Sequence, residues 1–291
     1  MTDIAASPLE ILSAALAGLA AAAAPGVVAV HSRRSRSSGL AWRSDLIVTA
    51  DEALAEEGEV VVVTATGERR PAVIIGRDPS TDVALLRVEG LALEPVHFAA
   101  ELLRPGALAL VIGGETLVHS GAVATVGPAW HSMRGGEIDA RIELDLRLRR
   151  EAEGGLAIDA GGRAFGMAVF GPRPRTLVIP AATIERVAVR LERDGRVPRG
   201  YLGVGLQPVR VDTVGGVAAM IMSLDQDGPA ATAGLHQGDV IVSWDGRPVA
   251  GVDGLLRALG PDSVGRTIAI TVRRGGAALD LTVTVAERPK A

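Results

Sequence analysis

Short apolar runs separated by Gly, Pro, Asp and Ser fill the chain from Val27 to about Pro180. Most runs are four to eight residues long and rich in Val, Ile and Leu, which is typical of antiparallel strands in a barrel or sandwich. The clearest runs are residues 27–30, 46–50, 59–67, 70–78, 82–88 and 107–113. The segment 137–150 alternates charged and apolar residues over most of its length, so we expect it to form a half-exposed strand.

The chain begins with a different pattern, because residues 8–24 are mostly alanine. We expect this segment to form an amphipathic helix that ends at Pro25-Gly26 and packs on the following domain. Residues 11–30 carry no charge and are numerous enough to cross a membrane, so a cleaved or anchoring signal is the alternative. A secretory signal starts with basic residues, whereas Asp3 and Glu10 lead here, which favours the packed helix and no membrane span.

A second helix and a second set of strands follow Pro180. Ile184, Val187 and Leu191 lie near helical spacing and Gly195 ends the run, which predicts a linker helix. From Arg199 onward, short strands recur with tight turns and two short helices. We therefore divide the chain into an N-terminal Ala-rich helix (1–25), a β-rich domain (26–180), a linker helix (181–197) and a second β-rich domain (198–288).

Composition narrows the classes of function. An apolar fraction of 48% and a charged fraction of 22% over 291 residues indicate a globular protein with sizeable cores. The net charge of −4 and the 2% aromatic content argue against a nucleic-acid partner. The chain has no Cys, which excludes disulfides, thiolate metal sites and a cysteine nucleophile. Lys290 is the only lysine, so no interior lysine acts as a base, and we expect no cofactor.

Four separated motifs occur in order along the chain: LIVTADEAL (46–54), GRDPSTDVALLRV (76–88), LVIPAATIERVAVRLERDGRVPRGYLGV (177–204) and GPAATAGLHQGDVIVSWDGRPV (228–249). Together they resemble the HtrA/Deg family of bacterial quality-control proteases, which are chymotrypsin-like serine proteases with a C-terminal PDZ domain. The resemblance covers nearly the whole chain after residue 25. It implies a mostly β fold, in which residues 26–180 form a chymotrypsin-like, or trypsin-like, double β-barrel and residues 198–288 form an α+β PDZ domain.

The catalytic positions depart from the pattern of that family. Such a protease needs a nucleophilic Ser, a His that takes its proton and an Asp that orients the His. By the resemblance, Asp82 holds the orienting position, but Glu52 occupies the His position and Glu153 the Ser position. Gly154-Gly155 and Asp145 fix the alignment around Glu153. A glutamate cannot replace the serine as acyl acceptor, because the product would be a strained mixed anhydride.

The family's oxyanion loop is altered as well. The residue two before the nucleophile is normally Gly and is Glu151 here, in the same former oxyanion loop as Gly154. A non-Gly residue held at positive φ costs roughly 1–2 kcal/mol, so we expect this loop to relax to another shape. With no catalytic residue set intact, the sequence favours an inactive pseudoprotease, and the alternative is an active serine endopeptidase. The histidines at 31, 97, 119, 131 and 236 are expected in loops or at the surface.

Glu52, Asp82 and Glu153 would lie close together if the fold is kept. Like charges at short distance cannot all ionise cheaply, so one pKa should rise or a cation should neutralise them. Arg149 and Arg150, which are adjacent in sequence, are the expected partners. A Ca²⁺ or Mg²⁺ site at the three carboxylates is a minor alternative, and a carboxylate pair acting on a sugar is a weaker one.

The PDZ recognition loop, in contrast, looks complete. It is Tyr201-Leu202-Gly203-Val204, and its last three backbone N–H groups would hold the terminal carboxylate of a peptide. Leu202 and Val204 would wall the pocket for the last side chain. The peptide would add as a strand beside residues 205–208.

The following helix is expected to complete the peptide groove. Helical spacing places Val252 and Leu256 toward the groove and Leu255 and Leu259 toward the core. The partners are therefore protein or peptide C-termini, or unfolded segments, with apolar residues at the last and third-last positions. A homo-oligomer, or a mixed oligomer with an active relative, is compatible with the family. The lack of a basic signal start favours the cytoplasm, whereas the resemblance points to the periplasm.

Overall fold

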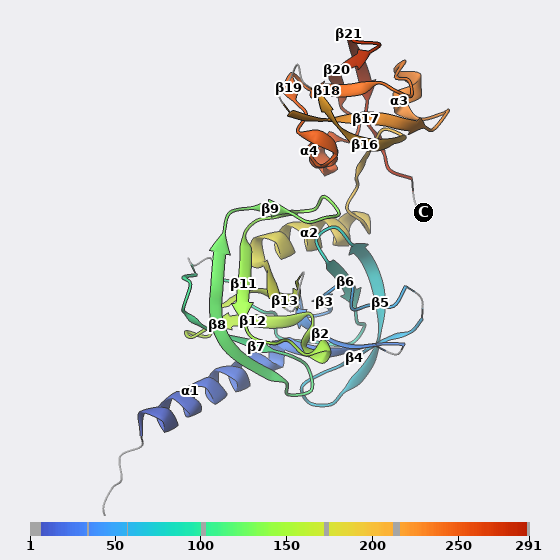
Figure 1. The fold of residues 1–291 in the computed structure, drawn as a ribbon. Coiled ribbons are helices and arrows are strands. Elements are labelled where there is room, and N and C mark those ends of the chain that lie inside the picture. The colour runs from blue at the N-terminus through green and yellow to red at the C-terminus, as the bar shows by residue number, and fades with distance from the viewer. Residues whose placement is uncertain are drawn as a thin grey trace, which may run out of the picture. The chain divides into compact units, whose positions relative to one another are not determined.

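The computed structural model describes residues 7–33, 35–56, 58–99, 103–171, 175–211 and 216–289. The chain forms two compact units, residues 1–196 and 197–291, and each is described by itself. The first unit contains two closed β-barrels and the second contains a sheet with short helices (Figure 1). The mostly β fold predicted from the sequence, with a double barrel followed by a second β-rich domain, is confirmed.

The first barrel closes with strand order β1-β2-β3-β6-β5-β4. Its strands are β1 (Val27–Ser32), β2 (Ser35–Ala41), β3 (Leu46–Thr49), β4 (Val60–Val63), β5 (Arg69–Asp78) and β6 (Val83–Arg87). Val28, Val30 and Leu86 are among its fully buried core residues. Every neighbouring pair of strands is antiparallel, as short apolar runs joined by turns predict.

The second barrel has strand order β11-β14-β13-β12-β7-β8. Its strands are β7 (Leu108–Ile112), β8 (Val118–Gly127), β11 (Arg141–Asp145), β12 (Gly155–Asp159), β13 (Ala164–Phe170) and β14 (Thr176–Pro180). The short strands β9 (Trp130–His131) and β10 (Glu137–Ile138) form a separate hairpin. The single strand predicted for residues 137–150 is wrong. β10 and β11 divide this segment, and a 3-10 turn, η2 (Arg150–Ala152), follows at residue 150.

The expectation of a half-exposed strand fails at Glu143 in β11. This side chain is only 4% exposed. Its carboxylate accepts hydrogen bonds from Arg141, at 2.9 Å, and from Arg175. The two guanidinium groups hold the pKa of Glu143 below its usual range. A charged residue inside the sheet is tolerated because both of its oxygens are paired.

Helix α1 (Pro8–Ala23) forms as the alanine-rich pattern predicts. A capping box begins it, because the Ser7 side chain accepts the backbone N–H of Glu10 and the Glu10 carboxylate accepts the N–H of Ser7. The predicted packing on the following domain is wrong for most of the helix, since Leu9 and Ile11 are 77% and 60% exposed and Ala20 alone is buried. By length and apolar composition, residues 8–26 meet the criterion for a membrane-crossing helix, which signal sequences also meet.

Helix α2 (Ala181–Asp194) closes the first unit with one buried face. Ile184, Val187 and Leu191 are buried, as their spacing predicts. Gly195 ends the helix in the left-handed conformation at φ +69°. The chain there lies so close to β5 that a Cβ on Gly76 would lie 2.4 Å from the Gly195 carbonyl oxygen.

The second unit is built on a sheet of order β16-β17-β18-β20-β21, with β16 at one edge. Its strands are β15 (Gly200–Tyr201), β16 (Val204–Val211), β17 (Gly216–Leu224), β18 (Val240–Trp244), β19 (Arg247–Pro248), β20 (Thr267–Arg274), β21 (Ala277–Thr284) and β22 (Ala286–Glu287). The helices are α3 (Pro229–Thr232) and α4 (Gly251–Ala258). Leu255 of α4 packs into the core with Ile221 and Ile241 of the sheet. The edge position of β16 leaves its outer side open to another strand.

Candidate functional site

Three carboxylates come together between the two barrels. Glu52 lies in the turn after β3, Asp82 lies just before β6 and Glu153 follows η2. The backbone N–H of Glu52 donates to Asp82 Oδ1 at 2.8 Å. The negative charges of Glu52 and Glu153 both act on Asp82. These are the three side chains that the sequence resemblance assigns to the base, the orienting acid and the nucleophile, and the structure brings them within electrostatic range of one another.

The proximity of these carboxylates changes the pKa values of two of them. Burial, together with the charges of Glu52, Glu153 and Asp51, raises the pKa of Asp82 to about 7, although the N–H bond from Glu52 lowers it. Burial also raises the pKa of Glu153, because this residue is only 5% exposed. The Phe170 N–H and the Arg150 charge oppose that rise. Near neutral pH the cluster thus holds a proton that separated carboxylates would release.

Arg134, from the β9–β10 hairpin, supplies the direct ion pair of the cluster. Its Nη2 lies 3.4 Å from Glu52 Oε1, and its Nη1 donates to the Pro79 carbonyl oxygen at 3.2 Å. Ser132 in the same hairpin also donates to the Ser80 carbonyl oxygen. These bonds fold the hairpin back toward the turn before Asp82. The sequence carries no local signal for this partner, because Arg134 and Glu52 are far apart along the chain.

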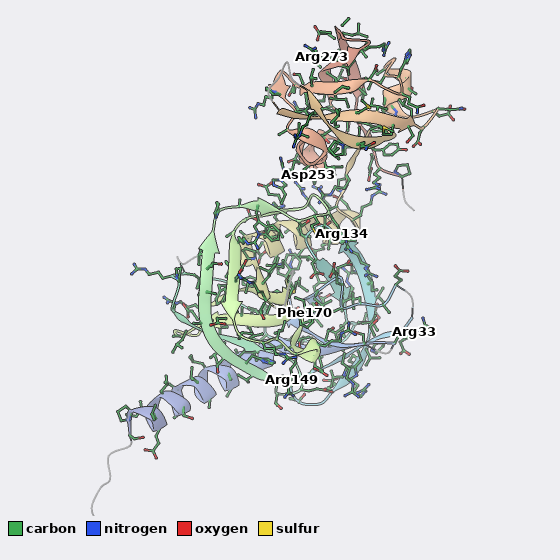
Figure 2. All side chains as sticks on the ribbon, viewed as in Figure 1. Arg33, Arg134, Arg149, Phe170, Asp253 and Arg273 are labelled. Carbon is green, nitrogen blue, oxygen red and sulfur yellow. The ribbon has the colours of Figure 1, made fainter. Side chains whose placement is uncertain are left out.

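The two arginines expected as partners behave differently. The Arg150 charge acts on Glu153, as predicted. Arg149 instead lies beside His119 and lowers the pKa of that imidazole, so the expectation that it neutralises the cluster is not supported. Figure 2 labels Arg149 and Arg134 well apart on this unit.

The former oxyanion loop is closed by its own hydrogen bonds. In η2, the Glu153 N–H donates to the Arg150 carbonyl oxygen at 3.1 Å, and the Ala152 N–H donates to that of Arg149 at 3.0 Å. Glu151 is not among the described non-glycine residues at positive φ, so its backbone carries no left-handed strain. The Glu153 N–H is therefore already used within the loop.

Ser38 holds this closed loop from the neighbouring strand β2. Its hydroxyl donates to the Glu151 carbonyl oxygen at 2.6 Å and accepts the Gly114 N–H at 2.9 Å. Its backbone N–H donates to the Glu153 carbonyl oxygen at 2.7 Å. Gly154 follows at φ +82°, where a Cβ would lie 2.2 Å from the Ser38 carbonyl oxygen. Gly154 is therefore required by the packing of this turn.

A cavity of about 490 Å³ lies beside the cluster and carries both charge signs. It is lined by Ser32, Arg33, Ser35, Glu52, Ala53, Leu54, Ala55, Arg150 and Glu153. Within the described ranges, no three His, Asp or Glu side chains converge as a metal ion would need. The geometry thus gives no support to the metal alternative and presents a polar cleft with mixed charges.

The PDZ loop presents backbone donors next to an open strand edge. Gly203 lies at φ +72°, and the Leu202 and Gly203 carbonyl oxygens accept N–H groups of Ala230 and Asp225 at 2.9 Å. No hydrogen bond between described residues uses the N–H of Leu202 or Gly203. The Tyr201 hydroxyl donates to the Asp225 carboxylate, a contact that fixes the loop and that the sequence did not reveal.

The side chains of the predicted groove divide between core and surface. Leu202 is 2% exposed and belongs to the core of this unit, so its predicted place in the pocket wall stays a prediction. Val204 is half-buried against that core. On α4, Leu255 and Leu259 are buried, whereas Leu256 is 44% exposed and Val252 is half-buried. The open edge of β16 and the outer face of α4 thus offer backbone and apolar contacts.

Asp82→Asn is expected to stabilise the protein at high pH. The unfolded carboxyl titrates at 3.8 and the folded one at about 7, so the folded state binds the extra proton between these values. Stability from this group is full below pH 4 and is lost as the pH rises through 7, at a cost of up to about 4 kcal/mol. Asn keeps the acceptor for the Glu52 N–H and tolerates φ +58°.

Urea unfolding at pH 4 and pH 8 tests this expectation. The variant should gain roughly 2–4 kcal/mol at pH 8 and nothing at pH 4. Asp45→Asn is the matched control, since Asp45 makes only a surface pair with Arg87 at 3.8 Å. A variant that is less stable than the wild type at pH 8 would contradict the charge repulsion described here.

Comparison with known proteins identifies both units. A family model described as a trypsin-like peptidase domain matches residues 37–167, and a PDZ domain model matches residues 200–285. A probable periplasmic serine endoprotease, DegP-like, of Brucella suis biovar 1 (strain 1330) is 30% identical over 276 residues, covering 88% of this chain and 53% of that protein. The protein of that name from Bartonella henselae is 32% identical over 272 residues, covering 87% and 53%. The chain spans about half the length of these relatives.

Solved structures agree on the fold. The serine endoprotease from Yersinia pestis has a TM-score of 0.75 at 25% identity and covers 94% of this chain and 98% of its own. The HtrA-type protease AlgW with decapeptide has a TM-score of 0.77 at 22% identity and covers 95% and 99%. The second likeness shows the fold alone.

Proposed function

Since the chain belongs to the HtrA/Deg family of trypsin-like peptidases with PDZ domains, we propose that it is a catalytically inactive member that captures peptide C-termini through its PDZ domain. The observation that carries this proposal is the replacement of both proton-transferring positions by Glu52 and Glu153, with the 153 N–H bonded inside the loop. Its role is then that of a scaffold, regulator or chaperone-like partner.

The residues of the cluster give no route to peptide cleavage. A serine protease needs an imidazole to take the hydroxyl proton and N–H donors to stabilise the oxyanion. At this site the cluster offers only carboxylates, and negative charge at Glu151 and Glu153 would repel an oxyanion. Removing triad members costs on the order of a million-fold in turnover. We therefore expect no labelling of any serine by a fluorophosphonate probe and no cleavage of fluorescent casein.

The competing proposal is an active serine endopeptidase. It is favoured by the names of the relatives, which are serine endoproteases. Labelling of a serine by the fluorophosphonate probe would support the active endopeptidase.

Peptide capture follows from the intact edge strand and recognition loop. A terminal carboxylate would accept the N–H groups of Leu202 and Gly203, and the peptide backbone would pair with β16. The apolar side chains of the peptide would lie against Leu256 and Val252 of α4. The presence of a decapeptide with the solved structure of AlgW fits this role.

Peptides with free and amidated C-termini test the proposal by fluorescence polarisation. A peptide that ends in apolar residues at its last and third-last positions should bind, and amidation should weaken it at least about tenfold through the lost charge-assisted hydrogen bonds. Leu256→Arg should weaken binding by a similar factor, because it places a cation on the apolar face. Arg257→Ala, at the next position of α4, is the matched control. Equal binding of both peptide forms would overturn carboxylate recognition.

A further inference from the structure

A second cavity, rich in arginine, lies beside the η2 loop. It has a volume of about 550 Å³ and is lined by His119, Arg147, Leu148, Arg149, Arg150 and Glu151. Leu148 is buried and anchors the segment, while the three arginines around it are exposed. No ion pair between described residues involves Arg147, Arg149 or Arg150, whereas arginines elsewhere in this unit pair with carboxylates, as Arg77 does with Asp51.

His119, on β8, adds a buried polar atom to the same cavity. Its Nε2 is buried and has no hydrogen-bond partner among the described residues. The backbone carbonyl of Arg147 lies near the same imidazole and partly opposes the lowering of its pKa by burial. Burial and the charge of Arg149 lower the pKa of His119, which favours the neutral imidazole. A buried nitrogen without a partner is costly and is normally satisfied by a ligand or water.

We propose that this cavity binds a phosphoryl-bearing anion. Arginine guanidinium groups form forked, charge-assisted hydrogen bonds that match phosphate oxygens. Three like charges on one short segment repel each other until an anion neutralises them. The anion would also favour a proton on His119 Nε2, which would then donate to it. The carboxylate of Glu151 is the one acidic group on the wall and opposes binding.

Calorimetric titration of the full chain with sodium pyrophosphate at low salt tests this site. The wild type should bind one equivalent, and Arg147→Ala and Arg149→Ala should each weaken binding at least about fivefold. Glu151→Gln should tighten it about twofold or more by removing the opposing charge. Arg193→Ala removes an exposed arginine on α2 and should leave binding unchanged. Equal losses from Arg193→Ala, or no saturation by 5 mM pyrophosphate (about 10³ times a micromolar affinity), would overturn the proposal.

The pKa of the His119 imidazole gives a second readout, which nonspecific binding of anions elsewhere on the protein would not change. In NMR spectra, pyrophosphate should raise the pKa of His119 in the wild type and leave the imidazole resonances of His236, in the other unit, unmoved. An unmoved His119 in saturated protein would overturn the proposed contact. Arg150 is left intact in all variants, because its charge also acts on Glu153.

The phosphoryl group can belong to a soluble anion or to a lipid headgroup. Sedimentation with phosphatidylcholine vesicles, with and without phosphatidic acid, separates the two sources. Pyrophosphate binding without sedimentation assigns the site to soluble anions. Sedimentation that requires phosphatidic acid and is abolished by both Arg147→Ala and pyrophosphate assigns it to the headgroup. Failure of both arms overturns the site, while PDZ peptide capture and protease inactivity are measured separately and stay unaffected.

Discussion

The combined variant Glu52→His, Glu153→Ser and Glu151→Gly is expected to cleave fluorescent casein, whereas the wild type shows no turnover above background. The orienting carboxylate is already in place, since Asp82 accepts the backbone N–H of residue 52 at 2.8 Å. An imidazole at 52 would then lie between Asp82 and a hydroxyl at 153. Because triad loss costs on the order of a million-fold, even partial restoration should exceed background by about a thousandfold or more.

The third substitution, Glu151→Gly, tests how much the shape of the loop contributes to turnover. With Glu151 retained, the 153 N–H stays bonded to the Arg150 carbonyl oxygen. The double variant Glu52→His and Glu153→Ser should therefore be slower than the triple variant by about 10²–10³, the value of one oxyanion donor. A triple variant with Ala in place of the new Ser is the inactive control. Wild-type turnover comparable to that of the triple variant would contradict the proposed inactivity.

Arg274→Ala is expected to unfold the PDZ unit at much lower denaturant concentration. Asp239 is fully buried and accepts two bonds from Arg274, both at 2.8 Å, and one from the His236 N–H. The hydrogen bonds from the Arg274 side chain are the main reason that the pKa of Asp239 lies below its usual range. Removing the guanidinium leaves a buried carboxylate without its cation. We expect a loss of about 3 kcal/mol, near the lower end for a broken buried pair because Arg274 is partly exposed.

Calorimetry of the full chain measures this loss of stability as a lower unfolding temperature of the PDZ unit. Arg266→Ala, which breaks only the exposed pair with Asp245 at 3.3 Å, should cost less than about 1 kcal/mol. The difference between the variants should shrink as the pH falls below the usual range of Asp239, since a depressed pKa gives stability only above it. Equal losses from the two variants would show that the buried pair contributes nothing beyond a surface pair.

The sequence by itself determined the elements and the chemical identity of the site. Apolar alternation located most barrel strands, and the helical spacing with Gly195 located α2, because these patterns depend on neighbours within a few residues. The order of the motifs predicted that Glu52, Asp82 and Glu153 belong to one site, and the structure brings their charges together. Local pattern could not determine burial, so it failed for α1, which is largely exposed.

Only the tertiary structure decided how the site is neutralised and closed. Arg134 reaches Glu52 through a folded hairpin, and Ser38 reaches the Glu151 carbonyl across 113 residues of chain. Such bonds depend on where strands meet in space, and no periodicity along the chain records them. The same holds for Glu143 in β11, whose buried charge is paired with Arg141 of the same strand and with Arg175, which is distant in sequence and lies just before β14. Residue identity is fixed by sequence, whereas ionisation and loop shape follow from the distances between residues that only folding brings together.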